Sequence, residues 1–202
     1  IAQGAKVLVV ACNTATAAAI ADLRAEHADL PIVGIEPALK PAAAQTQTGK
    51  VGVMATRGTL GSRKFLALMQ QIQTQAPPTI DFVVQACDGL ADAIEKNDAT
   101  KIGAYCAQYT GLMGQFGMQP GCIDTLVLGC THYPFVRDLI SDVVGKDIVL
   151  VETGLAVASQ LKNRLIESGL LCASHSVGDV KFWTNSTAEN AAQVIESLWG
   201  AR

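Results

Sequence analysis

Positions 126–134 of the chain read Leu-Val-Leu-Gly-Cys-Thr-His-Tyr-Pro, an apolar run that ends in a small residue, a cysteine and two polar residues. Positions 7–14 carry a similar stretch, Val-Leu-Val-Val-Ala-Cys-Asn-Thr. Leucine and β-branched side chains favour a buried strand, and the polar residues that follow predict a turn into a helix. We therefore expect two strands that each end in a cysteine, Cys12 in one and Cys130 in the other.

The rest of the chain alternates between strand and helix patterns. We expect strands over residues 6–11, 31–35, 50–55, 79–86, 124–128, 147–151 and 180–184. We expect helices over residues 15–28, 39–47, 60–75, 87–95, 99–113, 135–144, 155–168 and 186–198, the last of them capped by Ser186. Such alternation predicts an α/β fold with βαβ units and mainly parallel sheet, in which ligands bind at the carboxyl ends of the strands.

Composition narrows the class of protein. The 202 residues suffice for one large domain or two small ones, and they are 50% hydrophobic but only 5% aromatic, which predicts a core of Ala, Val, Leu and Ile. The net charge of −3 does not indicate the positively charged surface that binds nucleic acid. No apolar run approaches the roughly 20 residues of a membrane helix, and the first residues lack the shape of a signal peptide. We expect neither nucleic acid nor membrane as a partner.

The cysteines and histidines do not suggest a disulfide framework or a metal site. A chain of this length can support its own core without disulfides. No Cys-x-x-Cys pair occurs, and His27, His132 and His175 are scattered along the sequence. We expect a reduced, cytoplasmic protein without a metal, in which most of the six cysteines pack as small core residues.

A cysteine after a strand is more often a packed core residue than a nucleophile. Cys12 and Cys130, however, each precede polar side chains at a turn into a helix, where the helix dipole favours negative charge. A phosphatase loop would need an arginine after five intervening residues, whereas six separate Cys130 from Arg137. A papain-like site would need a remote histidine, and His132 lies only two residues away.

Two similar half-sites, each with one thiol, suit proton transfer at a carbon acid. One group removes the α-proton, and a second returns a proton on the opposite face. Negative charge then develops at the adjoining carboxylate, which needs hydrogen-bond donors. Polar residues beside the cysteines are placed to supply them: Asn13, Thr14, Thr131 and His132. From the residues alone, the core-cysteine interpretation stays open beside this one.

The segments Val10–Thr16 and Leu128–Pro134 together resemble the two cysteine motifs of the glutamate racemase family, within the aspartate/glutamate racemase superfamily. Residues 33–38 and 51–56 are also similar to family segments, in the family's order, so that the resemblance runs over almost the whole chain. The ending His-Tyr-Pro is its specific part, since aspartate racemases and arylmalonate decarboxylases of the same superfamily usually differ there.

The resemblance implies a cofactor-independent mechanism in which Cys12 and Cys130 act on opposite faces of the α-carbon of glutamate. It implies that His132 assists Cys130. It further implies that four residues contact the substrate, namely Asn13, Thr14, Thr131 and His132.

Three further residues match family positions, each with a simpler alternative. Thr56 and Thr59 match a Thr-x-x-Thr that is proposed to hold a carboxylate, and helix capping would explain them equally well. Glu95 lies eight residues after Cys87, as does a family glutamate credited with supporting one cysteine. The family's usual Pro-Leu after that cysteine is Asp-Gly here, so a solvated helix glutamate is the alternative for Glu95.

The family fold implies two pseudo-symmetric α/β lobes with the active site between them. We expect residues 1–34 plus 153–202 in the first lobe and residues 35–152 in the second, with a hinge near 34–37 and 151–154. Family members also carry a strand ending in Asp-Ser-Gly, and then a Tyr-Gly pair, before the first cysteine, and neither lies within residues 1–202. We therefore expect a first lobe without its N-terminal part, and a 202-residue polypeptide that alone folds poorly and is nearly inactive.

The implied function is interconversion of L- and D-glutamate by a cytoplasmic homodimer, which supplies D-glutamate for peptidoglycan and thereby for cell wall biogenesis and cell shape. Two enzymatic alternatives stay open, a racemase of another acidic amino acid and a cofactor-free decarboxylase. A third alternative is a degenerate family member that binds a ligand without catalysis.

Overall fold

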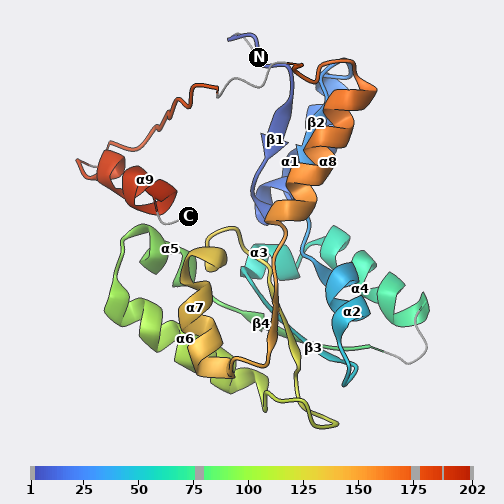
Figure 1. Ribbon diagram of the computed structural model, residues 1–202, viewed down its shortest axis with the longest axis vertical. Helices are drawn as coiled ribbons and strands as arrows, with labels where there is room; N and C mark the ends of the chain where they lie inside the picture. The colour runs from blue at the N-terminus through green and yellow to red at the C-terminus, as the bar shows by residue number, and fades with distance from the viewer. Residues whose placement is uncertain (1–2, 76–79, 174–177, 188, 201–202) are drawn as a thin grey trace.

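The computed structural model describes residues 3–75, 80–173, 178–187 and 189–200 (Figure 1). Its strands form two parallel sheets, one of order β1-β2 and one of order β4-β3-β5-β6. The strands are β1 (Leu8–Val10), β2 (Ile32–Gly34), β3 (Lys50–Ala55), β4 (Asp81–Ala86), β5 (Thr125–Leu128) and β6 (Val149–Val151). The helices are α1 (Asn13–Glu26), α2 (Leu39–Gln45), α3 (Arg57–Leu60), α4 (Arg63–Gln75), α5 (Leu90–Glu95), α6 (Ala99–Met113), η1 (Tyr133–Val136), α7 (Arg137–Val144), α8 (Gly154–Glu167) and α9 (Ala191–Gly200). The predicted α/β class with parallel sheet is confirmed.

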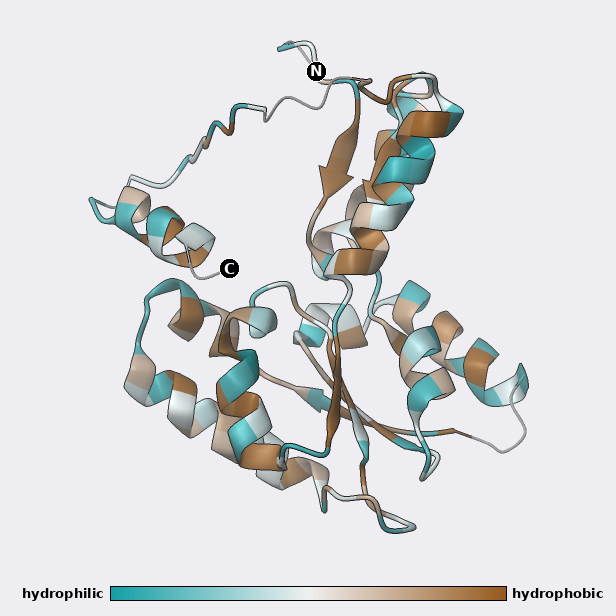
Figure 2. Ribbon diagram, in the orientation of Figure 1, coloured by the Kyte–Doolittle hydropathy of each residue, from teal (hydrophilic) through white to brown (hydrophobic). Residues whose placement is uncertain are grey.

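Apolar residues pack on both faces of the larger sheet. Figure 2 shows the hydropathy of each residue along these strands and helices. Val53 and Val127 pack with α2 and α4 on one face. Met54, Leu126 and Leu128 pack with α5, α6 and α7 on the other. Strands that are buried on both faces read as continuous apolar runs, which explains why positions 126–128 lack a polar residue.

The smaller sheet is less deeply buried. Residues of β1 are half-buried, whereas Ile32 and Val33 of β2 are buried. Both α1 and α8 contact β2. Along the whole of α8 no residue is buried, and Leu155 is 88% exposed. The strand β1 is therefore less deeply buried than β3 and β5 of the larger sheet.

Two expected helices are each divided. Residues 60–75 belong to α3 and α4, because the chain turns at Gly61 and Ser62 Oγ accepts a hydrogen bond from the backbone N–H of Phe65 (3.2 Å) at the start of α4. The helix expected from residue 135 starts earlier, as the 3₁₀ turn η1, whose first turn contains Pro134. Proline suits the first turn of a helix, because the N–H that it lacks would have no hydrogen-bond partner within the helix there.

Two expectations near the end of the chain are wrong. Residues 180–184 form no strand, because none of the described strands pairs with them; Trp183 there is 70% exposed. The last helix begins at Ala191, so Ser186 does not cap it. Position 79 of the expected fourth strand lies outside the described residues. Among the described helices, none combines the length and the apolar character that crossing a bilayer requires.

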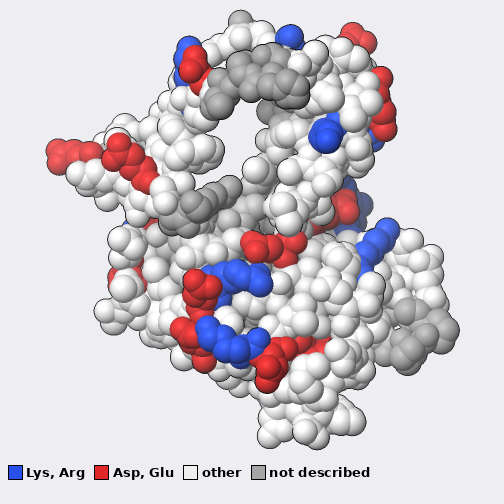
Figure 3. Space-filling view, viewed as in Figure 1, with Lys and Arg blue, Asp and Glu red and all other residues white. Residues whose placement is uncertain are grey.

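Charged side chains of both signs lie side by side over α7 (Figure 3). Arg137 pairs with Glu152 at 3.2 Å, and Lys146 pairs with Asp142 within the same region. Exposed pairs of this kind stabilise a fold only slightly, by about 0–1 kcal/mol each. The face shown in Figure 3 therefore carries mixed charge rather than a field of one sign.

Candidate active site

The two cysteine turns come from different sheets and meet through one hydrogen bond. Asn13 Nδ2 donates to the carbonyl oxygen of Gly129 at 3.0 Å, and each partner is the chain neighbour of a cysteine, Cys12 or Cys130. Asn13 is only 5% exposed, so this bond is shielded from water. The amino end of α1 therefore lies against the carboxyl end of β5 (Figure 1).

Gly129 is small because the larger sheet leaves no room for a side chain there. A Cβ atom on Gly129 would lie 2.8 Å from the carbonyl oxygen of Met54 and 3.0 Å from the Cβ of Ala55. The Gly129 N–H also donates to Met54 O at 2.7 Å. The glycine thus lets the cysteine turn lie directly on β3.

Cys130 lies in a buried environment, with 9% of its surface exposed. Burial is the main reason that the pKa of Cys130 is raised above its ordinary value. A hydrogen bond from the His132 backbone lowers this pKa, and the negative charges of Cys12 and Glu95 raise it. The net effect keeps Cys130 protonated at neutral pH, in the form that can donate a proton.

His132 connects Cys130 to Glu95. Its Nδ1 lies 3.6 Å from Cys130 Sγ, and its Nε2 lies 2.7 Å from Glu95 Oε1. When the carboxylate accepts from Nε2–H, the neutral imidazole keeps Nδ1 free as an acceptor toward the thiol. Glu95 thus pairs with His132, and 58% of its side chain is at the same time exposed to solvent.

Cys12 is exposed and forms the N-cap of α1. Its Sγ accepts a hydrogen bond from the backbone N–H of Ala15 at 3.5 Å. Backbone N–H groups at the start of a helix stabilise negative charge. Cys12 thus differs from Cys130 in that solvent reaches it directly.

Three threonine hydroxyls form a cluster beside Cys12. The Oγ1 atoms of Thr14, Thr56 and Thr59 lie 2.9, 3.1 and 3.0 Å from one another. Thr56 is also the N-cap of α3, where its hydroxyl accepts from the N–H of Thr59 at 3.4 Å. The two interpretations of this pair are therefore compatible, since the capping residue also belongs to a cluster of hydroxyl donors.

The sequence did not identify two tyrosines that donate hydrogen bonds to the loop before α5. Tyr133 is fully buried, and its hydroxyl donates to the carbonyl oxygen of Cys87 at 3.4 Å. The Tyr109 hydroxyl donates to the carbonyl oxygen of Asp88 at 2.5 Å. Of these two tyrosines, the sequence motif His-Tyr-Pro pointed to Tyr133 but not to Tyr109. Thr131 is half-buried and makes no side-chain hydrogen bond within the described part of the chain.

Three of the six cysteines are buried, so the expectation that most are core residues is only half right. Burial raises the pKa of Cys87 to about 12 and that of Cys106 to about 11. Neither is a nucleophile at neutral pH. Within the described part of the chain, Cys130 is the buried thiol that has a histidine beside it.

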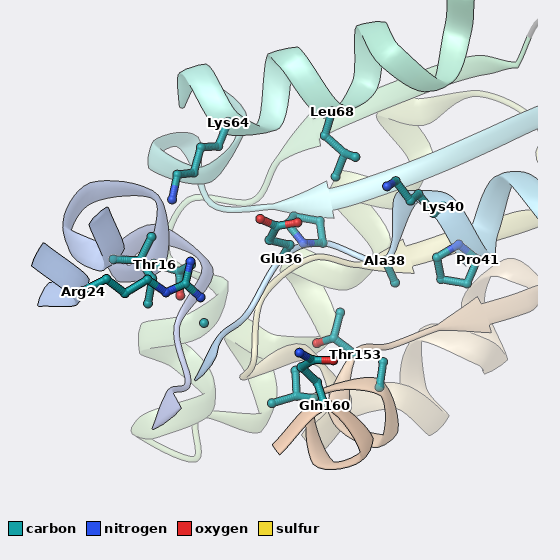
Figure 4. A pocket seen from close by; sticks show the side chains of 15 residues that line it. Thr16, Arg24, Glu36, Ala38, Lys40, Pro41, Lys64, Leu68, Thr153 and Gln160 are labelled. Carbon is teal, nitrogen blue, oxygen red and sulfur yellow. The ribbon is translucent and has the colours of Figure 1, made fainter. Parts of the chain in front are cut away.

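A separate hollow of about 290 Å³ lies between α1, α2, α4 and α8 (Figure 4). Arg24, Lys40 and Lys64 line it together with one acidic residue, Glu36. In Figure 4 these charged side chains surround the middle of the hollow, with Thr153 on another wall. Within the described residues none of the three basic side chains forms an ion pair. The hollow does not include either of the two cysteines of the candidate site.

Comparison with known families identifies the chain. The family model described as Asp/Glu/hydantoin racemase matches residues 1–161. The chain belongs to this racemase family. The glutamate racemase of Pseudomonas entomophila is 44% identical over 199 residues, which cover 98% of this chain and 71% of that protein. The resemblance recognised in the sequence is thus confirmed, and the family's members are isomerases.

Solved racemases share the fold. The Escherichia coli glutamate racemase, in complex with L-glutamate and the activator UDP-MurNAc-Ala, matches with a TM-score of 0.71 and 27% identity over 96% of this chain and 70% of that one. The glutamate racemase of Francisella tularensis matches with a TM-score of 0.77 and 22% identity over 98% of this chain and 71% of that one. The matched region is thus about seven tenths of the length of these racemases.

Proposed function

We propose that this racemase interconverts L- and D-glutamate by cofactor-independent proton transfer between two cysteines, Cys12 and Cys130. One observation carries the proposal. The hydrogen bond between Asn13 and Gly129 joins two cysteine turns that belong to different sheets. A substrate held there would present its α-carbon to one thiol from each side.

The proposed proton transfer uses the two sulfurs in turn. A thiolate at Cys12 takes the α-proton of one enantiomer, and the Cys130 thiol donates its proton to the opposite face of the carbanion. Cys130 then carries the negative charge, and the two cysteines exchange roles for the reverse reaction. His132, oriented by Glu95, is placed to stabilise or accept the Cys130 proton.

Hydrogen-bond donors support the charge that develops on the substrate. The threonine cluster of Thr14, Thr56 and Thr59 offers hydroxyls that can rotate toward a carboxylate. Asn13 and Thr131 each directly follow one of the two cysteines in the sequence. Such groups stabilise an anionic intermediate most effectively where water is excluded. We propose these residues as the substrate-binding set, with His132 contributing to both binding and catalysis.

Incubation of the intact protein in deuterated water tests the proposal. With either enantiomer of glutamate, we expect racemisation accompanied by incorporation of deuterium at the α-carbon. Racemisation of aspartate alone would favour a racemase of another acidic amino acid. Carbon dioxide release from an arylmalonate, without racemisation, would favour a decarboxylase. Binding of glutamate without exchange would mark a degenerate member that only binds.

The cellular role is proposed from the same activity. D-Glutamate serves peptidoglycan synthesis, and we propose a cytoplasmic homodimer that supplies it and thus supports cell wall biogenesis and cell shape. Complementation of a bacterial strain that requires D-glutamate checks the role, and sedimentation of the intact protein checks the dimer. A monomer at micromolar concentration would contradict the oligomeric part alone.

We also propose that the protein works as two lobes, residues 1–34 plus 153–202 and residues 35–152. The larger sheet and both of its helical layers lie within 35–152. A polypeptide of that range should fold by itself, with slow amide exchange in β3 and β5. Rapid exchange throughout those strands would contradict the division.

The hollow in Figure 4 supports a second proposal, which concerns regulation. The E. coli relative binds an activator with phosphate groups, UDP-MurNAc-Ala. Here the hollow carries three basic side chains against one carboxylate, which suits an anionic ligand. We propose that it takes an effector of this kind. Lys40→Gln together with Lys64→Gln should weaken binding of UDP-MurNAc-Ala at least tenfold, roughly the loss of one or two charge-assisted contacts, whereas Lys162→Gln on α8 should not.

A further inference from the structure

The candidate site lacks a permanent cation, although its proposed substrate carries two carboxylates. None of the residues predicted for the site is Lys or Arg, and Glu95 adds a negative charge. The hydrogen-bond donors of the predicted set are hydroxyls, the amide of Asn13, backbone N–H groups and the imidazole of His132, and none of them carries a permanent positive charge. A cation at the rim of the site would therefore strengthen the binding of an anionic substrate.

Arg57 is a cationic residue that directly follows Thr56 of the threonine cluster in the sequence. It is the first residue of α3 and directly follows Thr56, whose hydroxyl bonds both Thr14 and Thr59. Its side chain is 76% exposed. Because β4 and β5 flank β3 in the sheet, Arg57 lies at the same carboxyl edge as the cysteine turn after β5.

Asp88 holds this guanidinium in place. Arg57 donates to Asp88 Oδ2 through both Nε (3.2 Å) and Nη2 (2.5 Å). Asp88 is itself anchored, because its carbonyl oxygen accepts from the buried Tyr109. Its loop leads into α5, which ends at Glu95. The aspartate therefore fixes the position of the arginine and also cancels part of its charge.

We infer that Arg57 is a specificity-determining residue that draws acidic substrates to the threonine cluster, and that Asp88 moderates this attraction so that the product can leave. The observations that carry the inference are the adjacency of Arg57 to Thr56, the two-donor contact with Asp88, and the absence of Lys and Arg among the predicted site residues. The inference deepens the proposed function, since it names the charge class of the substrate.

The inference is tested with charge-changing variants of the intact protein. Arg57→Gln should raise KM for both enantiomers roughly fivefold and flatten the dependence of kcat/KM on ionic strength, since a cation at an open rim acts mainly on capture. Asp88→Asn should act in the opposite direction, with a lower KM and a steeper ionic-strength dependence. Arg57→Lys keeps the charge and should retain most of the wild-type KM.

A matched control is Arg164→Gln, which removes an arginine from an exposed ion pair with Glu167 on α8. This variant should leave KM and the ionic-strength dependence as in the wild type. If Arg57→Gln behaves like Arg164→Gln, the inference is wrong. If Asp88→Asn raises KM as Arg57→Gln does, the inference is also wrong. The ion pair would then stabilise the local structure rather than act on the substrate through charge.

Direct binding separates this inference from the proposed function. Glutarate carries two carboxylates but no amino group, so calorimetric titration with glutarate reports charge recognition without any reaction. Arg57→Gln should weaken glutarate binding roughly fivefold, and equal affinity would overturn the inference. A wild-type protein that binds glutarate in this charge-dependent way but racemises nothing would instead contradict the proposed function.

Discussion

The two cysteine turns look alike in sequence but lie in different surroundings. Cys130 follows β5, a strand with sheet neighbours on both sides and four buried residues. Cys12 follows β1, a half-buried strand with one neighbour in a two-stranded sheet. The thiol of Cys130 is buried and that of Cys12 is exposed. Local sequence therefore places each cysteine at a strand end, and the position of the strand in its sheet determines how much water the sulfur meets.

This asymmetry matters for a reaction that needs one base and one acid. Two identical thiolates would have no proton to return, and two thiols would have no base. Burial raises the pKa of Cys130, and His132, which pairs with Glu95, lies beside its thiol. Under the proposed mechanism, the two thiols work from different surroundings, and each serves as the acid in one direction and as the base in the other.

The largest expected effect comes from removing either sulfur. Cys12→Ser and Cys130→Ser should each lower racemisation by about a thousandfold, since a serine hydroxyl is a much weaker acid than a thiol. Each variant should still exchange the α-proton of one enantiomer with solvent deuterium, and the two variants should retain opposite enantiomers. If both variants exchanged the α-proton of the same enantiomer, the two half-sites would not act on opposite faces. If both variants still racemised glutamate, the two-base proposal would be wrong.

The next effect concerns stability and compares one leucine in each strand. Leu126 is fully buried in β5, so Leu126→Ala should cost roughly 3 kcal/mol in the free energy of unfolding through lost burial and a cavity. Leu8 is only half-buried in β1, and Leu8→Ala should cost about 1 kcal/mol. Urea denaturation measures both. Equal losses would show that the two sheets are equally packed.

A smaller effect is expected when the support behind Cys130 is removed. Glu95→Gln keeps the shape of the side chain but lacks the carboxylate that orients His132, so kcat should fall about tenfold. Glu167→Gln, on the exposed surface of α8, serves as the control. An unchanged kcat in Glu95→Gln would mean that Cys130 needs no more support than Cys12.

The smallest effect lies at the start of β5, where Asp124 anchors the strand. Its carboxylate accepts from Thr46 Oγ1 (2.6 Å) and from the N–H groups of Gln47 (2.6 Å) and Thr48 (2.8 Å). Burial alone would raise the pKa of Asp124, but these hydrogen bonds outweigh burial and hold the pKa below its ordinary value. Asp124→Asn should therefore cost about 1 kcal/mol at neutral pH.

The pH dependence of that cost has a definite sign. A lowered carboxyl pKa stabilises the fold above the unfolded-state pKa of about 4, and this contribution is lost as the pH falls through the folded value. The difference in unfolding free energy between wild type and Asp124→Asn should therefore shrink below about pH 4. A difference that persists unchanged at pH 2.5 would show that the carboxylate charge is not involved.

Elements with strong local signals were predicted closely. The strand over residues 50–55 and the helix over 99–113 have the expected bounds, because a buried apolar run and a helix with an Asp98 cap are each encoded within a short stretch. Residues 180–184 show the limit of such signals. This short segment was expected to be a strand, but a strand also needs a partner, and none of the described strands supplies one.

The sequence by itself determined which side chains stand at strand ends, since a cysteine after an apolar run and before a helix depends only on neighbouring residues. Tertiary structure alone decided which of them meet. Asn13 reaches Gly129 across 116 residues and Glu95 reaches His132 across 37, and such contacts depend on how sheets and helices pack. Packing also decided that Cys130 is buried and Cys12 exposed, because burial is a property of a strand's place in its sheet and not of its own residues.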